Sequence, residues 1–579
     1  MSRYRGKLGA GMTAQAQKKI VQENKGFMND KAIKGREKDM TQTHGGAYVF
    51  SITDEAFLMR FLITGSTGSF YASQASQMSE HIEFLTNIAL GDISAGFKAI
   101  EMIETVSRQG RAVKNDSALF ALAVMTQSAH VIVRQRAYAA VPVVARTATH
   151  LFMLMGFLKE TRGFGRGLRR AINGWYLNRE TQSLAYQIAK YRNREGWTHR
   201  DVLRVTRPQA AKMTDEQKAL INYAVHPDQD SAIGGASQLS PVISAYEEMK
   251  RLPNNKQGIQ RGLDLIVTHN LPHEVVPNDW KKEIMVWTSL LPSMNPEALL
   301  RNLGRMTSLS MFQTTNKDYL RNIEMVRSVF LPERLRSARL HPLKIYIAMK
   351  AYTSGTSRGG LSWSANKQIL DILNSAFYNS FQYAPKTGKK IYLGLDVSGS
   401  MSQACYSPDG RTSQYGGYSH GGSGSISCHE AETIMARAIT AVEDDFHVAA
   451  FSHKLVDVTE TFDKTKDDIK TTVSKISRIP FGSTNLSLPM MDALSNPKLK
   501  NKAFDAFVIF TDNEVNIHAV HPAKLIADYR GKVGKPTRFI VVGMTANRIS
   551  IADPKDPYML DIGGFDSAIP KLLSEFISD

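Results

Sequence analysis

The stretch IYLGLDVSGSM, residues 391–401, places an aspartate and two alternating serines directly after a short apolar run. Such a run is typical of a strand buried on both faces, so Asp396, Ser398 and Ser400 are expected at its carboxyl end. Two other polar stretches offer similar groups: Gly482-Ser483-Thr484-Asn485 and Thr511-Asp512-Asn513-Glu514. Carboxylate and hydroxyl oxygens are the ligands that hard divalent ions prefer, and the three stretches together predict a Mg²⁺ site.

An enzymatic role for Asp396 competes with this interpretation. A phosphatase of the haloacid dehalogenase type also places its nucleophilic aspartate after the first strand, but it needs a second aspartate two residues on. Ser398 occupies that position and cannot act as the acid that assists the leaving group. The short motifs GFGRG (163–167), TGKK (387–390) and HEAET (429–433) each lack a residue that a catalytic or phosphate-binding motif requires. We therefore expect a protein that binds rather than an enzyme.

The elements that must position these residues lie in the C-terminal third, after the basic linker PKTGKK. Apolar runs at 391–395, 446–451, 506–510 and 538–543 alternate with helical stretches such as 429–443. Continuous apolar runs joined by helices predict a doubly wound, mainly parallel α/β domain over residues 385–579. In such a sheet, ligands bind beyond the carboxyl ends of the strands, where the polar stretches collect.

The preceding region, residues 45–384, shows helical periodicity and almost no strand-like alternation. Segments 115–129, 296–306 and 341–352 carry apolar residues at three-to-four spacing. Asp54, Asn115 and Asn295 stand where helix N-caps are expected, and Pro296 suits a first helical position. We predict an all-α domain of stacked, HEAT-like helix pairs without a strict sequence period. Residues 1–44 have few apolar residues and are predicted to be a basic mobile tail.

Composition narrows the class of partner and the compartment. The chain has 72 Lys and Arg against 54 Asp and Glu, a net charge of +18, which favours nucleic acid over a membrane surface. Cys405 and Cys428 are too few for a disulfide scaffold, and their spacing to His420 or His429 is poor for zinc. The N-terminus is no secretory signal, and charged residues interrupt the longest apolar segment, 131–158. A soluble, cytoplasmic protein is expected.

Basic residues concentrate in two segments of the helical region, 161–180 and 189–208. The candidate RNA-binding residues are Arg162, Arg166, Arg169, Arg170, Lys190, Arg192, Arg194, His199 and Arg200, with Arg204 and Arg207 nearby. Guanidinium groups bind phosphates bidentately, and the interleaved Trp175, Tyr176, Tyr191 and Trp197 could stack on unpaired bases. Each of these aromatic residues is more often a core residue than a stacking platform. The pattern favours single-stranded or structured RNA.

The metal-site residues resemble those of the von Willebrand factor A domain. Its metal-ion-dependent adhesion site uses D-x-S-x-S, a threonine on a second loop and an aspartate on a third. This resemblance places Asp396, Ser398, Ser400, Thr484 and Asp512 at the matching positions. It implies a binding role, in which an acidic group of a partner protein occupies the open position of the ion. The Gly/Ser-rich insertion at 402–428 is a departure from the family pattern that could alter access to the ion.

The helical region resembles the TROVE module of the Ro ribonucleoprotein autoantigen and its bacterial relatives. The segments that carry the resemblance are GFGRGLRRAINGWY, KYRNREGWTHRDVLR, LLRNLGRMT, HPLKIYIAM and, near the C-terminus, MLDIGGFDSAIPKLL. In that family, helical repeats form a ring that the von Willebrand A domain closes. The hole takes single-stranded 3′ ends of misfolded noncoding RNAs, and the basic outer face binds small Y RNAs.

This resemblance implies a noncatalytic protein of RNA quality control. Bacterial relatives are tethered by Y RNA to an exoribonuclease, so such a nuclease is an expected partner. The histidine that the family associates with Y RNA binding falls on His199. The alternative is a metal-dependent protein-interaction scaffold whose basic helices are only solvated.

Overall fold

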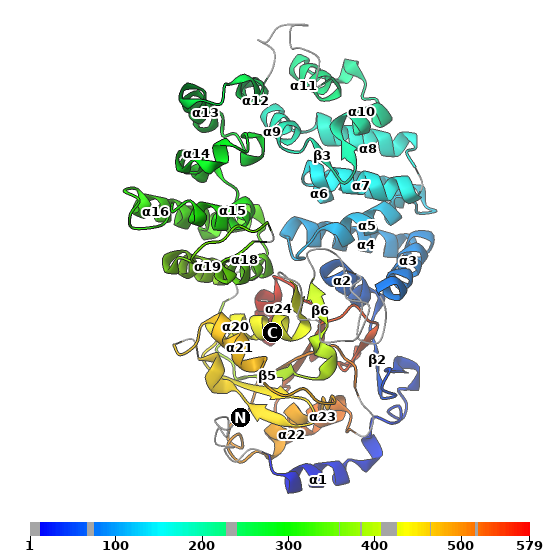
Figure 1. Ribbon diagram of the computed structural model, residues 1–579. Helices are drawn as coiled ribbons and strands as arrows, with labels where there is room; N and C mark the ends of the chain where they lie inside the picture. Colours follow the sequence, from blue (N-terminus) through cyan, green and yellow to red (C-terminus); the bar gives the residue numbers. More distant parts are fainter. Residues whose placement is uncertain are drawn as a thin grey trace. The chain divides into compact units, whose positions relative to one another are not determined.

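The computed structural model describes residues 12–65, 74–161, 163–226, 240–357, 359–381, 385–406, 425–463, 465–515 and 519–578, and for 74–77 the backbone only (Figure 1). The chain forms two compact units. One is Ile82–Ser380, and the other combines Met1–His81 with Phe381–Asp579. The prediction of a helical region followed by an α/β domain is confirmed.

A six-stranded sheet organises the α/β unit. In order across the sheet, its strands are β13 (Met559–Gly563), β11 (Arg538–Gly543), β10 (Ala506–Thr511), β5 (Ile391–Asp396), β8 (Phe446–Phe451) and β9 (Leu455–Asp457). All neighbours are parallel except β8 and β9. The four strands predicted from apolar runs are β5, β8, β10 and β11, and β5 and β10 are buried along their whole length. The strand order reverses between β5 and β10, which is where a doubly wound sheet offers a binding crevice.

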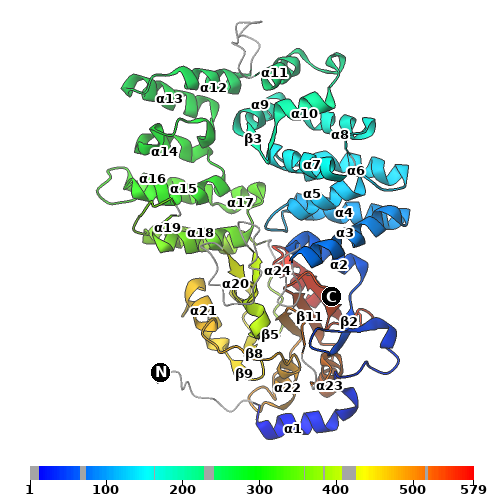
Figure 2. The same ribbon diagram turned by 45° about the vertical axis from the view of Figure 1, so that its right-hand side comes forward.

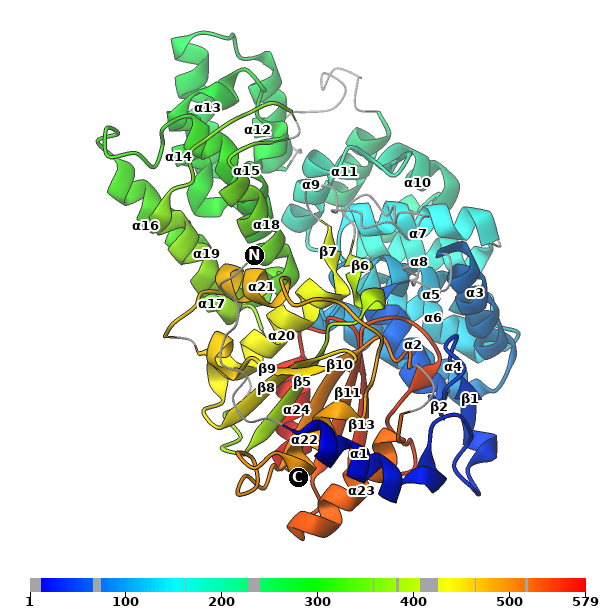
Figure 3. The same cartoon turned by 60° about the horizontal axis from the view of Figure 1, so that its bottom comes forward.

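Helices cover both faces of this sheet. The helices are α20 (Cys428–Val442), α21 (Ile469–Ile476), α22 (Leu488–Ser495), α23 (Pro522–Val533) and α24 (Ile569–Ser578). Figure 3 shows the sheet between α20 and α21 on one side and α22 and α23 on the other. Helix α20 begins with a capping box, in which Ser427 and Glu430 exchange hydrogen bonds with each other's backbone.

The N-terminal segment belongs to this unit, and the prediction of a mobile tail is wrong for residues 14–44. Helix α1 (Ala14–Glu23) packs on α22, and its Ile20 and Val21 contact the core of the unit. Strands β1 (Met40–Gln42) and β2 (Tyr48–Ser51) pair with β12 (Ile549–Ser550) in a second sheet. The few apolar residues of this segment suffice because the chain itself supplies the surface that buries them.

Helix α2 (Asp54–Thr64) is attached to the α/β unit by a buried arginine. Arg60 is fully buried and donates to both carboxylate oxygens of Asp561, at 3.1 and 2.6 Å, and to the carbonyl of Ile549. Gly543 and Gly563 lie against its side chain, where an added Cβ would come within 2.6 and 2.7 Å of Arg60 atoms. These two positions need glycine because the arginine fills the space. The cap of α2 is Thr53, one residue before the predicted Asp54.

The helical unit begins within α3 (Gln74–Leu90) and runs to α19. Its helices are α4 (Ile93–Gln109), α5 (Asp116–Met125), α6 (Val131–Val144), α7 (Ala148–Thr161), α8 (Arg166–Leu177), α9 (Thr181–Lys190), α10 (His199–Thr206), α11 (Asp215–Val225), α12 (Pro241–Arg251), α13 (Lys256–His269), α14 (Ile284–Leu290), α15 (Pro296–Ser308), α16 (Tyr319–Val329), α17 (Pro332–Ala338), α18 (Pro342–Ser354) and α19 (Lys367–Asn379). Asn295 caps α15 through its side chain and Pro296 is the first helical residue, as predicted. No helix in the described ranges is long and apolar enough to cross a membrane.

Alternate helices of this unit pack into rows. Helix α6 contacts α4 and α8, α8 contacts α10, and α5 contacts α7, so α4, α6, α8 and α10 form one continuous row (Figure 2). Between α9 and α10, the two-residue strands β3 (Asn193–Arg194) and β4 (Trp197–Thr198) form a short hairpin. The helices of a row bury their apolar stripes against the next row, which leaves their polar faces on one continuous surface.

Candidate metal centre and nucleic-acid face

The predicted metal-site residues meet at the carboxyl edge of the central sheet. Asp396 ends β5 and Asp512 follows the neighbouring parallel strand β10. Both carboxylates are at most 1% exposed, Ser398 is 1% exposed and Ser400 is 6% exposed. The parallel register of β5 and β10 therefore carries two acidic side chains to one place, as the sequence pattern predicts.

Hydrogen bonds fix the loop after β5. The backbone N–H of Ser398 donates to Oδ1 of Asp396 at 3.0 Å, and the hydroxyl of Thr511 donates to Oδ2 at 2.7 Å. The hydroxyls of Ser398 and Ser400 lie 3.1 Å apart. The loop is thus preorganised, with the oxygens of Asp396 and both serines held in fixed positions before a ligand binds.

The loop that carries Thr484 joins the same edge. Ser398 forms a parallel bridge with Gly482, and the N–H of Gly399 donates to the carbonyl of Gly482 at 3.2 Å. Thr484 is 6% exposed. A backbone hydrogen bond therefore joins the loop after β5 to the loop between α21 and α22, and Asp512 lies on the loop after β10.

The electrostatics of this cluster favour a cation. Burial, and for Asp512 also the neighbouring charge of Asp396, raises the pKa of both aspartates. Glu432 on α20 accepts from the N–H of Asp396 at 3.1 Å, and burial raises its pKa well above the usual range. Oδ2 of Asp512 is buried and accepts no hydrogen bond from the part of the chain that the structure describes. A hard divalent ion would satisfy this oxygen and relieve the repulsion between the carboxylates, so these residues fit Mg²⁺.

A zinc-like cluster does not form among the described residues. They include no group of three or more His, Cys, Asp or Glu side chains placed to hold a metal ion. The candidate set differs from such clusters because it has two carboxylates and takes its remaining oxygens from hydroxyl groups. That composition suits an ion that keeps several water ligands.

The N-terminal segment holds the loop of Asp512, which the sequence did not indicate. The hydroxyl of Thr43 donates to the carbonyl of Val515 at 2.9 Å, and the N–H of His44 donates to the Glu514 carboxylate at 3.1 Å. The N–H of Glu514 in turn donates to Oδ1 of Asp512 at 3.1 Å. These contacts join positions hundreds of residues apart, so no local pattern could have indicated them.

Helix α8 presents the main basic face. Leu168, Ile172, Trp175 and Tyr176 are buried on one side, while Arg166, Arg169 and Arg170 are exposed on the other. None of the three arginines forms an ion pair with any residue in the described ranges, and α8 contains no acidic residue. On the adjacent α10, Arg204 is exposed as well, and Arg207 is exposed at its C-terminal end. Arg166, Arg169, Arg170, Arg204 and Arg207 are thus exposed on the adjacent helices α8 and α10.

His199 lies inside the protein, and the prediction that it contacts RNA directly is wrong. It is 3% exposed, its Nδ1 lies 2.9 Å from the hydroxyl of Tyr176, and its ring packs edge-on against Phe152. Burial lowers the pKa of His199 to about 4, so it is neutral at pH 7. Trp175 and Tyr176 are also fully buried. His199 therefore supports the α8 and α10 face from behind.

The other candidate RNA-binding residues do not lie on helix α8. Lys190 is 11% exposed in its side chain and lies 3.6 Å from Glu274, which makes it part of an internal ion pair. Arg192 and Arg194 are both exposed, and Arg192 donates to the hydroxyl of Tyr246 at 2.6 Å. Arg200 is half-buried on α10. Arg162 lies outside the described residues.

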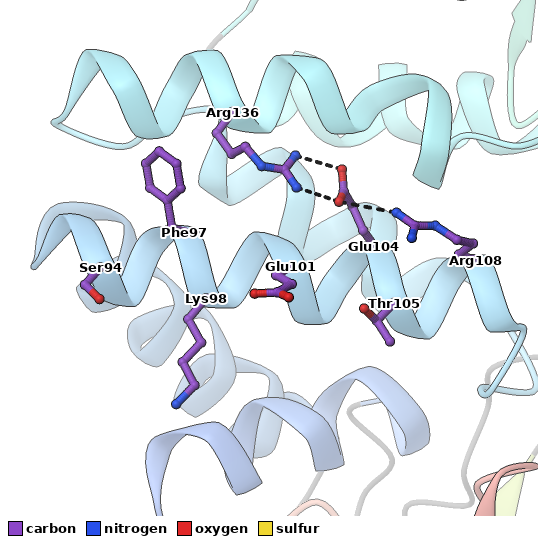
Figure 4. A pocket seen from close by; sticks show the side chains of 8 residues that line it. All are labelled: Ser94, Phe97, Lys98, Glu101, Glu104, Thr105, Arg108 and Arg136. Carbon is purple, nitrogen blue, oxygen red and sulfur yellow. Dashed lines mark hydrogen bonds and ion pairs between the residues drawn. The ribbon is translucent and has the colours of Figure 1, made fainter.

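A groove of about 500 Å³ lies further along the same row, on α4 and α6. Its lining residues are Ser94, Phe97, Lys98, Glu101, Glu104, Thr105, Arg108 and Arg136 (Figure 4). Arg136 reaches from α6 to Glu104 with both guanidinium nitrogens, at 2.8 and 2.6 Å, and Arg108 lies 3.7 Å from the same carboxylate. The groove's guanidinium groups are already neutralised, in contrast to those on α8.

Comparisons with known proteins agree with this two-part organisation. The family model described as TROVE domain matches residues 41–238, and the one described as Ro60 vWA domain matches residues 390–577. The chain is 29% identical to the RNA-binding protein RO60 of Caenorhabditis elegans over 612 residues, covering 93% of this chain and 90% of that protein. It is 28% identical to the RNA-binding protein RO60 of Deinococcus radiodurans over 545 residues, covering 93% and 96%. The crystal structure of the Deinococcus radiodurans RO (RSR) protein matches with a TM-score of 0.64 and 26% identity, over 91% of this chain and 99% of that one.

Proposed function

Since this chain belongs to the Ro family, with a TROVE domain followed by a Ro60-type von Willebrand factor A domain, we propose that it is a noncatalytic RNA-binding protein. The relatives that match over nearly their whole length are named as RNA-binding proteins. The observation that carries the proposal for this chain is the face of α8 and α10. It offers exposed guanidinium groups without acidic partners among the described residues.

The chemistry of this face supports structured RNA as the ligand. Arginines without an ion-pair partner can bind phosphates bidentately. Their free energy of binding to RNA should be more favourable than that of Arg108 and Arg136 on α4 and α6, which already pair with Glu104. Trp175 and Tyr176 are core residues, so they cannot stack on bases, whereas Tyr191 and Trp197 are half-buried. We therefore assign to this face a Y-like small RNA, held mainly through its phosphates and its shape.

The finer role is quality control of noncoding RNA. In this proposal, single-stranded 3′ ends of misfolded RNA enter the helical domain, and a Y-like RNA on the basic face tethers an exoribonuclease. The protein acts as the scaffold of a ribonucleoprotein in the cytoplasm. The net charge of +18 supports a polyanionic partner of this kind.

A Mg²⁺ ion is the proposed ligand of the second site. Asp396, Ser398, Ser400, Thr484 and Asp512 would hold it, directly or through water, and it would supply an open position for an acidic group of a partner protein. The buried, unsatisfied oxygen of Asp512 supports this assignment. This site adds a protein-binding function that does not depend on the basic face. It would remain if the protein were a metal-dependent scaffold with no RNA role.

Crosslinking in cells tests the RNA proposal and identifies the ligand. After irradiation with ultraviolet light, we expect small structured noncoding RNAs attached to peptides from residues 163–177 and 199–207. Peptides from α4 and α6 serve as an internal comparison, because their arginines are paired. Crosslinks confined to other surfaces, or RNA recovered no better than with an unrelated basic protein, would contradict the assignment.

A further inference from the structure

Cys405 and Cys428, the two cysteines of this 579-residue chain, lie side by side in the fold. Strand β6 (Ala404–Tyr406) pairs antiparallel with β7 (Ile426–Ser427), with Ala404 opposite Ser427. The register shifts by one residue between Ala404 and Tyr406, so Cys405 is the extra residue of a β-bulge. A bulge redirects a side chain out of the regular alternation of the strand.

Hydrogen bonds join the two segments that carry the cysteines. The N–H of Cys428 donates to the carbonyl of Gln403 at 2.8 Å, and the thiol of Cys405 donates to the carbonyl of Ser427 at 3.5 Å. Ser427 is the residue directly before Cys428, so Cys405 Sγ lies against the backbone that leads into its partner. Both cysteines are free thiols in this structure.

The two thiols differ in accessibility. Cys405 is half-buried and within reach of solvent, whereas Cys428 is fully buried at the first position of α20. The hydrogen bond with Cys405 and burial raise the pKa of Cys428 well above its usual value. A small oxidant in solution therefore meets Cys405 first, and Cys428 is placed to react in the second step.

We propose that Cys405 and Cys428 form a redox-active dithiol that low-molecular-weight disulfides such as oxidised glutathione convert into an intramolecular disulfide. The Cys405 thiolate attacks one sulfur of oxidised glutathione, which forms a mixed disulfide and releases one glutathione thiolate. The Cys428 sulfur then attacks Cys405 Sγ and its proton passes to the departing glutathione sulfur, which releases the second glutathione as a thiol. Two protein thiols lose two electrons in total, and one glutathione disulfide is reduced to two thiols.

The new bond would join two segments that flank the candidate metal centre. Strand β6 follows the turn of Gly399–Ser402, which contains Ser400, and α20 carries Glu432, which binds the N–H of Asp396. The proposal stands on the placement of the cysteines and does not depend on metal or RNA binding.

Mass spectrometry of the full-length protein tests the inference. Trypsin places Cys405 in peptide 391–411 and Cys428 in peptide 412–437, so the disulfide links two separate peptides. After incubation of the reduced protein with oxidised glutathione and alkylation, we expect these peptides to be joined with a loss of two hydrogens. The parent protein should lose both titratable thiols and remain free of intermolecular crosslinks.

Two single variants establish the order of the steps. Cys428→Ser should accumulate a stable mixed disulfide with glutathione at Cys405, while Cys405→Ser should remain unmodified because Cys428 is buried. The inference would be overturned if the parent kept two free thiols, or kept glutathione on Cys405 without forming the linked peptides. It would be overturned equally by disulfides formed only between protein molecules. The parent protein alone distinguishes these outcomes even if a variant fails to fold.

Discussion

Two buried carboxylates, Asp396 and Asp512, determine the chemistry of the candidate metal centre. Each accepts a backbone hydrogen bond from its own loop, and Asp396 also accepts one from Thr511. Burial raises the pKa of Asp512, and the neighbouring charge of Asp396 raises it further. Their placement could be predicted from sequence because both directly follow apolar strands that lie next to each other in the sheet.

Replacement of Asp396 by alanine should abolish Mg²⁺ binding while the α/β unit stays folded. The side chain lies at the end of β5 and contributes to the loop rather than to the apolar core. Its loss also removes a repulsive charge, so the thermal midpoint without metal should change little. Titration calorimetry and a thermal scan measure the two effects, with the exposed Asp444→Ala as the matched control. Equal Mg²⁺ uptake by Asp396→Ala and the control would rule out this ligand.

His199 should contribute to stability in a pH-dependent manner. The pKa of His199 in the folded protein is about 4, below the usual 6.5. Between these two pH values the folded protein therefore binds fewer protons than the unfolded chain. The stabilisation is complete above the unfolded pKa and is lost as the pH falls toward 4. When the pH falls from 7 to 5, the parent should therefore lose about 2 kcal/mol more stability than the variant His199→Asn. Denaturant unfolding at the two pH values measures this, and an identical pH dependence in parent and variant would contradict the buried, neutral state.

The burial of His199 could not be predicted from its neighbours in sequence. It follows Trp197 and precedes Arg200, which is typical of a surface position. Its actual environment comes from Tyr176 on α8 and Phe152 on α7. The exposure of Arg166, Arg169 and Arg170 was predictable, because the apolar residues of α8 fall on the opposite side at helical spacing.

Among the elements, the N-terminal segment departs most from expectation. Helix α1 has few apolar residues, and by itself such a helix is marginal in water. The structure supplies the missing stabilisation from α22 and the core around it, which come from the opposite end of the chain. The four long apolar strands were predictable, since a strand buried on both faces is continuous in sequence. The short strands β9 and β13 were not, because they carry polar residues and are only partly buried.

Helix α2 should depend on Arg60 for its attachment. Replacement of Arg60 by alanine leaves Asp561 without its bidentate partner in a largely buried place, which should destabilise the unit by about 3–5 kcal/mol. The double variant Arg60→Ala with Asp561→Ala should lose less than the sum of the single variants, because no unpaired charge remains. Chemical denaturation of all four proteins gives the coupling energy, and strictly additive losses would show that the two side chains do not stabilise each other.

For the molecule as a whole, the change of sequence pattern near residue 385 lies close to the division between Ser380 and Phe381. Which segments make up each unit was only partly predictable, because Met1–His81 joins the C-terminal unit through contacts between distant parts of the sequence. The charge balance of the whole chain pointed to a polyanion. The structure adds that Arg166, Arg169 and Arg170 are exposed on α8, which carries no acidic residue.

The salt dependence of RNA affinity tests the central claim most directly. Removing one phosphate-binding charge should reduce the slope of log affinity against log salt by about 0.7–0.9, so Arg166→Gln, Arg169→Gln and Arg170→Gln together should reduce it by about 2–3. Neutralising the exposed Lys470, Lys498 and Lys500 on the α/β unit removes the same charge and serves as the control. We predict weaker binding and a shallower slope for the arginine variant alone. Unchanged affinity and slope in that variant, or equal effects in the control, would contradict RNA binding at this face.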